Sequence, residues 1–161
     1  MSVTGNLAFD EVAGGESRDL AMTIANSGTA ALTGTWTGAH VITACNGTGS
    51  VQDLICGAAR GAYKVGTSLT FSLTLTQTGN TVTGTANLAG PTGPVSGVVS
   101  GGVLVLTGTL RDSQGFTSVI TAWSTTSSGS AMSGTIGYSL TFNGVPGNAG
   151  IVASLSNVTR R

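Results

Sequence analysis

Charged side chains are scarce in this chain of 161 residues. They make up 7% of it, with six basic and six acidic residues that cancel, whereas an average soluble domain carries roughly 25%. No basic patch is present to neutralise phosphates, so we do not expect a nucleic-acid partner. No apolar run approaches the roughly 20 residues that a membrane helix needs. The sequence therefore predicts neither nucleic-acid binding nor a membrane span.

Residues that carry catalysis or bind metals are equally few. His40 is the single histidine, and a catalytic triad needs an imidazole beside a nucleophile and an orienting acid. Beyond residue 31 the only acids are Asp53 and Asp112, both in expected loops. A metal site would require more ligands than His40 and Asp53 supply. We therefore expect no enzyme activity, metal or cofactor, and a His40 ring that is hydrogen-bonded or solvated within a strand.

Helix-forming Glu, Lys and Gln are also rare, and no long segment repeats its apolar residues at the helical period of 3.6. The chain holds 26 glycines, with Thr and Ser filling most of the remainder. Thr and Val suit the pleated surface of a sheet, while Gly supplies turns and bulges. The composition predicts an all-β protein.

The stretch "SLTFSLTLTQTGNTVTGTANL", residues 68–88, is typical of a β-hairpin. Apolar residues occupy alternate positions, a Gly-Asn turn follows, and the alternation then resumes. The same pattern continues along the chain, with turns at 90–94 and 124–130 and a longer loop at 46–66. Eight strands are expected, at 32–45, 69–76, 81–88, 95–100, 103–110, 116–123, 131–142 and 148–160.

Eight strands joined in order by short turns form a meander, which can close into an antiparallel up-and-down barrel. Closure removes the exposed edge strands that favour aggregation. The apolar rows would then fill the lumen and the Thr and Ser rows would face water. We assign residues 32–161 to this barrel and residues 1–31, where acidic residues concentrate, to an N-terminal two-strand extension. A two-sheet β-sandwich shares the alternation and is the alternative.

The two cysteines, Cys45 and Cys56, flank a short segment. A disulfide between them would stabilise the fold by restricting the unfolded chain, and a pair of free thiols is the alternative. A disulfide together with low charge and many hydroxyl groups indicates a compartment outside the cytoplasm. The expected location is extracellular or at the cell surface, with the periplasm as a further option.

Residues 34–36, "GTW", resemble the Gly-x-Trp signature that opens the first strand of calycins, the lipocalin and avidin superfamily. The resemblance implies an eight-stranded barrel in which Trp36 plugs one end and packs under a basic residue near the last strand. Arg160 or Arg161 lies at the matching place. Where streptavidin-type barrels place their biotin ligands, this chain continues "TGAHVITA", so biotin binding is not expected.

Residues 5–35 resemble the first strands of hydin-type immunoglobulin-like repeats, which occur in large bacterial surface proteins. The matching features are "LAF", a "VAGGES" link and "TIANSGTAALT". The resemblance implies a surface setting and an exposed strand edge, and it carries no catalytic residue. Residues 3–31 could thus pair with a neighbouring subunit by strand addition.

Two non-enzymatic functions remain open. The first, which the sequence slightly favours, is a structural or adhesive subunit of a secreted or surface assembly, because no polar cluster is expected to converge in the lumen. The second is a carrier of a small apolar ligand, since an eight-stranded barrel can hold one if side chains leave room. The residues expected to line the lumen, or simply to fill it, are Phe71, Trp123, Met132, Tyr138 and Phe142.

Overall fold

The computed structural model describes residues 32–161, with the exception of residues 58 and 60. The extension expected over residues 1–31, including the segment 3–31 and its proposed pairing role, lies outside the described residues. The domain boundary expected at residue 31 also falls at the edge of these residues, so the structure does not test it.

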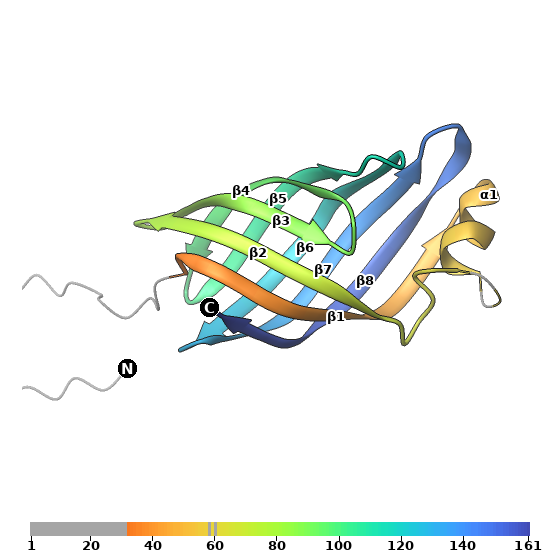
Figure 1. The fold of residues 1–161 in the computed structure, drawn as a ribbon. Helices are drawn as coiled ribbons and strands as arrows, with labels where there is room; N and C mark the ends of the chain where they lie inside the picture. The colour runs from red at the N-terminus through yellow and green to blue at the C-terminus, as the bar shows by residue number, and fades with distance from the viewer. Residues whose placement is uncertain (1–31, 58, 60) are drawn as a thin grey trace, which may run out of the picture.

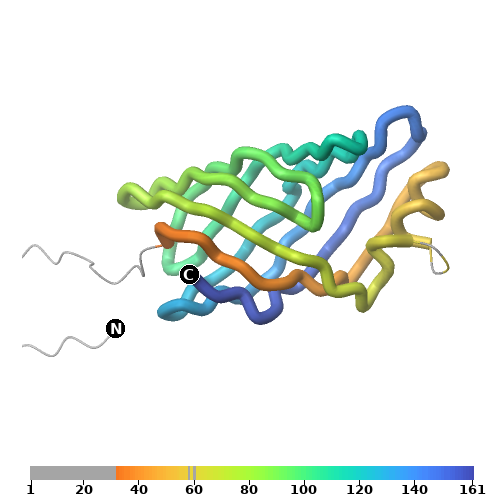
Figure 2. The backbone as a smooth tube through the Cα atoms, viewed as in Figure 1, coloured from red at the N-terminus to blue at the C-terminus, as the bar shows by residue number. Residues whose placement is uncertain are grey.

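Eight antiparallel strands close into one barrel (Figure 1). Each strand pairs with the next in the chain, and the last pairs with the first. Figure 2 follows this path once around the barrel. The prediction of an up-and-down barrel is confirmed, and the sandwich alternative is wrong. The strands are β1 (Gly34–Gly47), β2 (Ser68–Thr78), β3 (Thr81–Leu88), β4 (Thr92–Ser100), β5 (Val103–Arg111), β6 (Phe116–Ser128), β7 (Ala131–Phe142) and β8 (Val145–Arg160).

The alternation of apolar and polar residues in the sequence gives each strand a buried inner face and an exposed outer face. In β2, Phe71, Leu73 and Leu75 are buried, while Thr74 and Thr76, which alternate with Leu73 and Leu75, are exposed. Because successive side chains of a strand point to opposite faces, each strand contributes an apolar row to one continuous core. Burial of these rows is the main favourable term that holds the barrel closed.

Glycines on the inner face bring neighbouring strands close together. A Cβ atom built on Gly84 would overlap the carbonyl oxygen of Thr74, and one built on Gly97 would overlap the carbonyl oxygen of Val105. Side chains are therefore excluded at these two positions by backbone contact. Glycine in a strand interior commonly marks such a close approach or a tight bend of a barrel wall.

Parts of two expected turns belong to strands instead. Residues 124–128, expected in the link 124–130, extend β6 and pair with β7 from Ser124 opposite Thr135 to Ser128 opposite Ala131. Likewise β4 begins at Thr92 and includes Pro94. The ladder to β5 passes from Thr92 opposite Arg111 to Val95 opposite Gly108, over the proline that has no backbone donor.

The expected loop at 46–66 contains a short helical segment that the sequence did not reveal. Its first turn is α1 (Gly49–Val51), and a turn of π-helix, η1 (Gln52–Cys56), follows. Val51 and Ile55 lie four residues apart and are both buried in the core, as expected for one helix face. The segment is too short to show a helical period, and tertiary packing stabilises it.

The two ends of the barrel differ. At one end, Leu32 precedes β1 and is buried, and its carbonyl oxygen accepts a hydrogen bond from Trp36 Nε1 at 2.9 Å. The other end, which we call the mouth, is formed by α1, η1, residues 61–67 and the turns at 89–91, 112–115 and 143–144 (Figure 1). In the part of the chain that the structure describes, no helix is long and apolar enough to cross a membrane.

Candidate functional site

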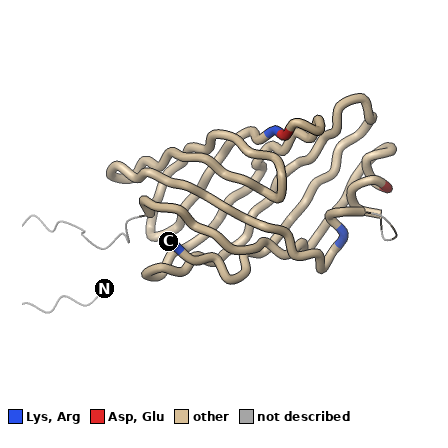
Figure 3. The backbone as a smooth tube through the Cα atoms, in the orientation of Figure 1, with Lys and Arg blue, Asp and Glu red and all other residues tan. Residues whose placement is uncertain are grey.

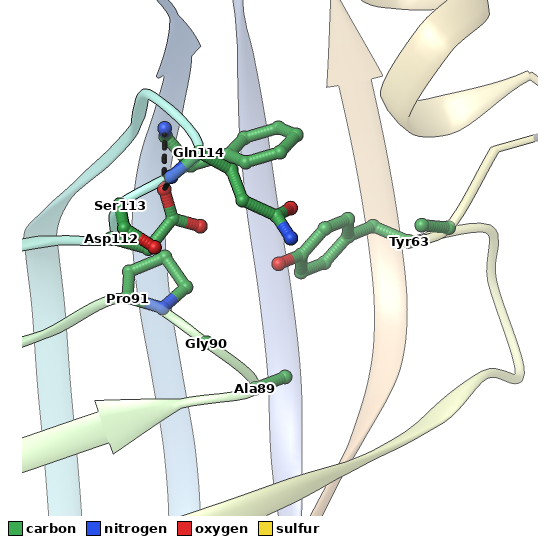
Figure 4. A pocket seen from close by; sticks show the side chains of 9 residues that line it. Tyr63, Ala89, Gly90, Pro91, Asp112, Ser113 and Gln114 are labelled. Atoms are coloured by element: carbon green, nitrogen blue, oxygen red, sulfur yellow. Dashed lines mark hydrogen bonds between the residues drawn. The ribbon is translucent and has the colours of Figure 1, made fainter.

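A pocket of about 410 Å³ lies at the mouth of the barrel (Figure 4). Three connections line it: residues 62–63 before β2, residues 89–91 between β3 and β4, and residues 112–114 between β5 and β6, together with Phe116, the first residue of β6. Pockets that hold small ligands have volumes of about 300–1,000 Å³ and often lie in the mouths of β-barrels. The size and the place of this pocket both suit a small molecule.

Tyr63 forms the floor of the pocket. Its backbone N–H donates to the carbonyl oxygen of Ile55 at 3.0 Å, which folds the chain back against η1. The ring is 7% exposed, and its hydroxyl points into the pocket in Figure 4. On its other side the ring packs edge-on against Tyr138, with 6.4 Å between ring centroids. Tyr63 therefore contacts both the pocket and a ring of the barrel interior.

Asp112 organises the opposite wall. Its Oδ1 atom accepts hydrogen bonds from the backbone N–H groups of Gln114 and Phe116, both at 2.9 Å. An Asp side chain that bonds the backbone two residues on is the usual signature of a tight turn. The turn places the Asp112 carboxylate and the Gln114 amide at the pocket, as Figure 4 shows.

A buried polar pair lies beneath Tyr63. His40 on β1 and Tyr138 on β7 both face the interior, and His40 Nε2 is 3.0 Å from the Tyr138 hydroxyl oxygen. Among the described residues, neither His40 Nδ1 nor the hydroxyl of buried Ser118 has a hydrogen-bond partner. The expectation that no polar cluster converges in the lumen did not anticipate this pair. Strand register brings residues 98 positions apart together here, which a periodicity cannot show.

Burial keeps all three rings of this region neutral. It lowers the pKa of His40 to about 4 from the ordinary 6.5. Burial also raises the pKa of Tyr138 and of Tyr63, and the negative charge of Asp112 raises the pKa of Tyr63 further. In each case the low-dielectric interior disfavours the charged form. Near neutral pH the interior below the pocket thus carries no charge on these groups.

The five residues expected to line the lumen occupy different depths. Phe71 and Trp123 are buried and pack together, with 5.9 Å between ring centroids. Met132 is buried near the end opposite the mouth, where it pairs with Val158. Tyr138 lies directly under the pocket floor. Phe142 is half-buried, and its ring packs at a tilt against Phe116, a pocket residue, with 4.6 Å between ring centroids.

Two structural pairs expected from the sequence are present. The Arg160 guanidinium lies 5.5 Å from the Trp36 ring centroid, and the two residues face each other across β1 and β8. Cys45 and Cys56 form a disulfide that joins β1 to η1, so this prediction is confirmed. Both pairs anchor the ends of the barrel and neither lines the pocket.

Sequence reasoning missed most residues of the pocket itself. Tyr63 stands in a loop rich in Gly and Ala, with no periodicity to give it a direction. The segment "RDSQGF" carries an Asp-Ser-Gln-Gly turn signal, which could have placed Asp112 at a barrel end. Nothing in the sequence says that these two connections meet, because their closeness depends on barrel closure.

Comparison with protein-family models, with curated proteins and with solved structures finds no match. Over residues 32–161, residues 58 and 60 apart, no group of three or more His, Cys, Asp or Glu side chains comes together to hold a metal ion. Besides its concave shape, the pocket offers two aromatic rings, one amide and one carboxylate. Such a set suits noncovalent binding.

Proposed function

We propose that this chain is a non-enzymatic β-barrel module that works outside the cytoplasm and holds a small, largely apolar ligand at the mouth of the barrel. The observation that carries the proposal is the pocket of about 410 Å³ over Tyr63. The disulfide supports the location, since such bonds persist in oxidising compartments.

The arrangement of the pocket also favours binding. The walls come from connections that strand ends hold in place, and loops set on a rigid scaffold are where binding residues concentrate. Tyr63 and Phe116 supply aromatic surface, and Asp112 and Gln114 supply polar groups that can orient a ligand. A mostly apolar concavity with a few polar groups is the usual form of a small-molecule site.

Titration of the full chain with small aromatic probes tests this function. Benzyl alcohol, benzylamine and benzoate share one ring and differ in charge. Nuclear magnetic resonance spectra of the backbone amides should show that at least one probe shifts the signals of Tyr63, Gln114 and Phe116. Native mass spectrometry of the purified protein should in parallel detect any small molecule retained from its source.

A variant whose pocket is filled by a large side chain serves as the control for binding at this site. Ser113 is an exposed turn residue that lines the pocket, so Ser113→Trp should block access without touching the core. Ser130, in the turn at the opposite end, is also exposed, and Ser130→Trp should leave binding unchanged. Shifts that scatter over the barrel, or that survive Ser113→Trp, would show that the pocket is not a binding site.

A second candidate function is a structural or adhesive subunit, which the surface of the barrel favours. In the described part of the chain, charged side chains cluster at the two ends and the wall between them is uncharged (Figure 3). Val98 on β4 and Val105 on β5 pair across the strands and are 50% and 44% exposed. An uncharged wall of this kind suits packing against a second copy of the chain.

Light scattering after size-exclusion chromatography tests the second candidate. Self-association should increase with concentration and should be lost in Val98→Lys, which places a charge on the wall. Thr141→Lys adds the same charge at an exposed position on β7 and should have a smaller effect. If the full-length chain is a monomer at every concentration, assembly through this wall is excluded.

A further inference from the structure

We propose that the mouth pocket selects small organic cations, namely molecules with an apolar or aromatic body and an ammonium group that contacts Asp112. This inference rests on the proposed binding function and adds the chemical class of the ligand.

The described lining of the pocket carries charge of one sign. Among the residues that the structure describes, residues 58 and 60 being outside them, Asp112 is the only acidic residue of the lining and none of the lining residues is Lys, Arg or His. Arg111 is adjacent in sequence but exposed and outside the pocket lining, and its Nη1 donates to Thr117 Oγ1 at 3.5 Å. His40 lies below Tyr63 and is neutral near neutral pH. A bound anion would therefore meet a carboxylate with no basic partner among the described lining residues.

The Asp112 carboxylate is held in place with one oxygen directed across the pocket. Both of its turn hydrogen bonds use Oδ1. The other oxygen, Oδ2, faces Gly90, where a Cβ atom would lie 3.7 Å away. Gly90 lines the pocket, so Oδ2 lies at its wall. A fixed carboxylate oxygen beside an apolar concavity is a strong acceptor for an ammonium donor.

The aromatic walls add to this preference. Tyr63 and Phe116 both line the pocket, and the faces of such rings attract cations within about 6 Å. Tyr63 is held against Tyr138 and Phe116 against Phe142, so the rings need little ordering when a ligand binds. A carboxylate with two positioned aromatic rings favours an ammonium group over a hydroxyl of the same size.

The test compares the affinities of the three probes for the full chain by isothermal titration calorimetry. Benzylamine is protonated near neutral pH, benzyl alcohol is neutral and benzoate is an anion. We expect benzylamine to bind about tenfold more tightly than benzyl alcohol, since hydrogen bonds to charged groups are the stronger ones. Benzoate should bind most weakly.

Asp112→Asn isolates the charge. Asparagine keeps an Oδ1 acceptor for the turn, so the fold should remain. Benzylamine and benzyl alcohol should then bind to the variant with about equal affinity. The matched control is Asp53→Asn, which removes an exposed charge from η1 outside the pocket lining and should preserve the preference.

The outcomes separate this inference from the function on which it rests. Equal affinity for benzylamine and benzyl alcohol, or a preference that survives Asp112→Asn, would overturn cation selection and leave the pocket a binding site. Tightest binding by benzoate would do the same. If none of the three probes binds, the binding function fails and the inference fails with it.

Discussion

His40 on β1 and Tyr138 on β7 form a hydrogen bond of 3.0 Å in the closed interior of the barrel. Their rings also meet edge to face, with 5.9 Å between centroids. The strand between them, β8, pairs with both β1 and β7. The bond therefore depends on the correct register of three strands.

Removing the Tyr138 hydroxyl should destabilise the fold. Tyr138→Phe leaves both nitrogens of a fully buried imidazole without a partner among the described residues, which costs about 1–3 kcal/mol of unfolding free energy. Tyr63→Phe is the control, because that hydroxyl faces the pocket, and it should change stability by less than about 0.5 kcal/mol. Urea unfolding followed by tryptophan fluorescence measures both. Equal losses would argue against a structural role for the His40–Tyr138 bond.

Mild acid should destabilise the barrel through His40. The pKa of this imidazole is about 4 in the fold and 6.5 as an ordinary value, so between these values the unfolded chain binds a proton that the folded chain does not. The contribution of His40 to the free energy of unfolding is therefore fully present above about pH 6.5 and declines as the pH falls toward 4. The total loss is on the order of 3 kcal/mol. Urea unfolding across this range should show the decline in the native protein. His40→Gln should remove it, and parallel profiles for the two proteins would contradict the assignment.

Reduction of the disulfide should loosen the mouth. Cys45 and Cys56 are 11 residues apart, and opening a loop of this length costs about 2–3 kcal/mol by the chain-entropy estimate. The double replacement Cys45→Ser with Cys56→Ser should lower the thermal midpoint. Dithiothreitol should produce a similar loss in the native protein and none in the double variant. A loss caused by the reductant in both proteins would point to another cause.

The Trp36–Arg160 contact should stabilise the end opposite the mouth. Replacing Arg160 by Ala removes a guanidinium 5.5 Å from the indole centroid, and such contacts contribute about 0.5–2 kcal/mol. Arg161→Ala is the matched control, since Arg161 is exposed, and its effect should be smaller. Guanidinium-induced unfolding compares the two variants. An equal loss for both would mean that the stacking contributes nothing measurable.

An added methyl group should distinguish the inner glycines from the outer ones. In Gly97→Ala the new Cβ atom would collide with the Val105 carbonyl, and such overpacking typically costs about 1–3 kcal/mol. In Gly150→Ala the nearest atom, the Asn46 carbonyl oxygen, would be 3.7 Å away, an ordinary contact. That variant should stay within about 0.5 kcal/mol of the native protein. Thermal unfolding by circular dichroism measures the difference, and similar midpoints would show that the wall can adjust.

Much of the fold could be predicted because its signal is local. The alternation of Leu73 and Leu75 with Thr74 and Thr76 indicates a strand and its buried face whatever lies elsewhere in the chain. The errors in the predicted strand bounds were also local in origin. Residues 124–128 and Pro94 carry turn-type composition, but pairing with neighbouring strands holds them in the sheet. Tertiary pairing overrides weak local preference in this way.

The candidate site could not be predicted to the same extent. Tyr63 and Asp112 lie in connections that have no period, and His40 gives no sign in sequence of its partner on β7. The Tyr138 ring was expected inside the barrel, but its contacts with His40 and Tyr63 were not. Each contact joins residues far apart in the chain, so it exists only when register and closure are both established.

The sequence by itself determined that eight strands form and which of their faces are buried, because a period of two acts over neighbouring residues and the hydrophobic effect acts on each strand alike. The tertiary structure alone decided where the polar groups meet. Closure of eight strands brings the connections at one end together over the interior, and only that closure places Tyr63, Asp112 and the His40–Tyr138 pair in one region.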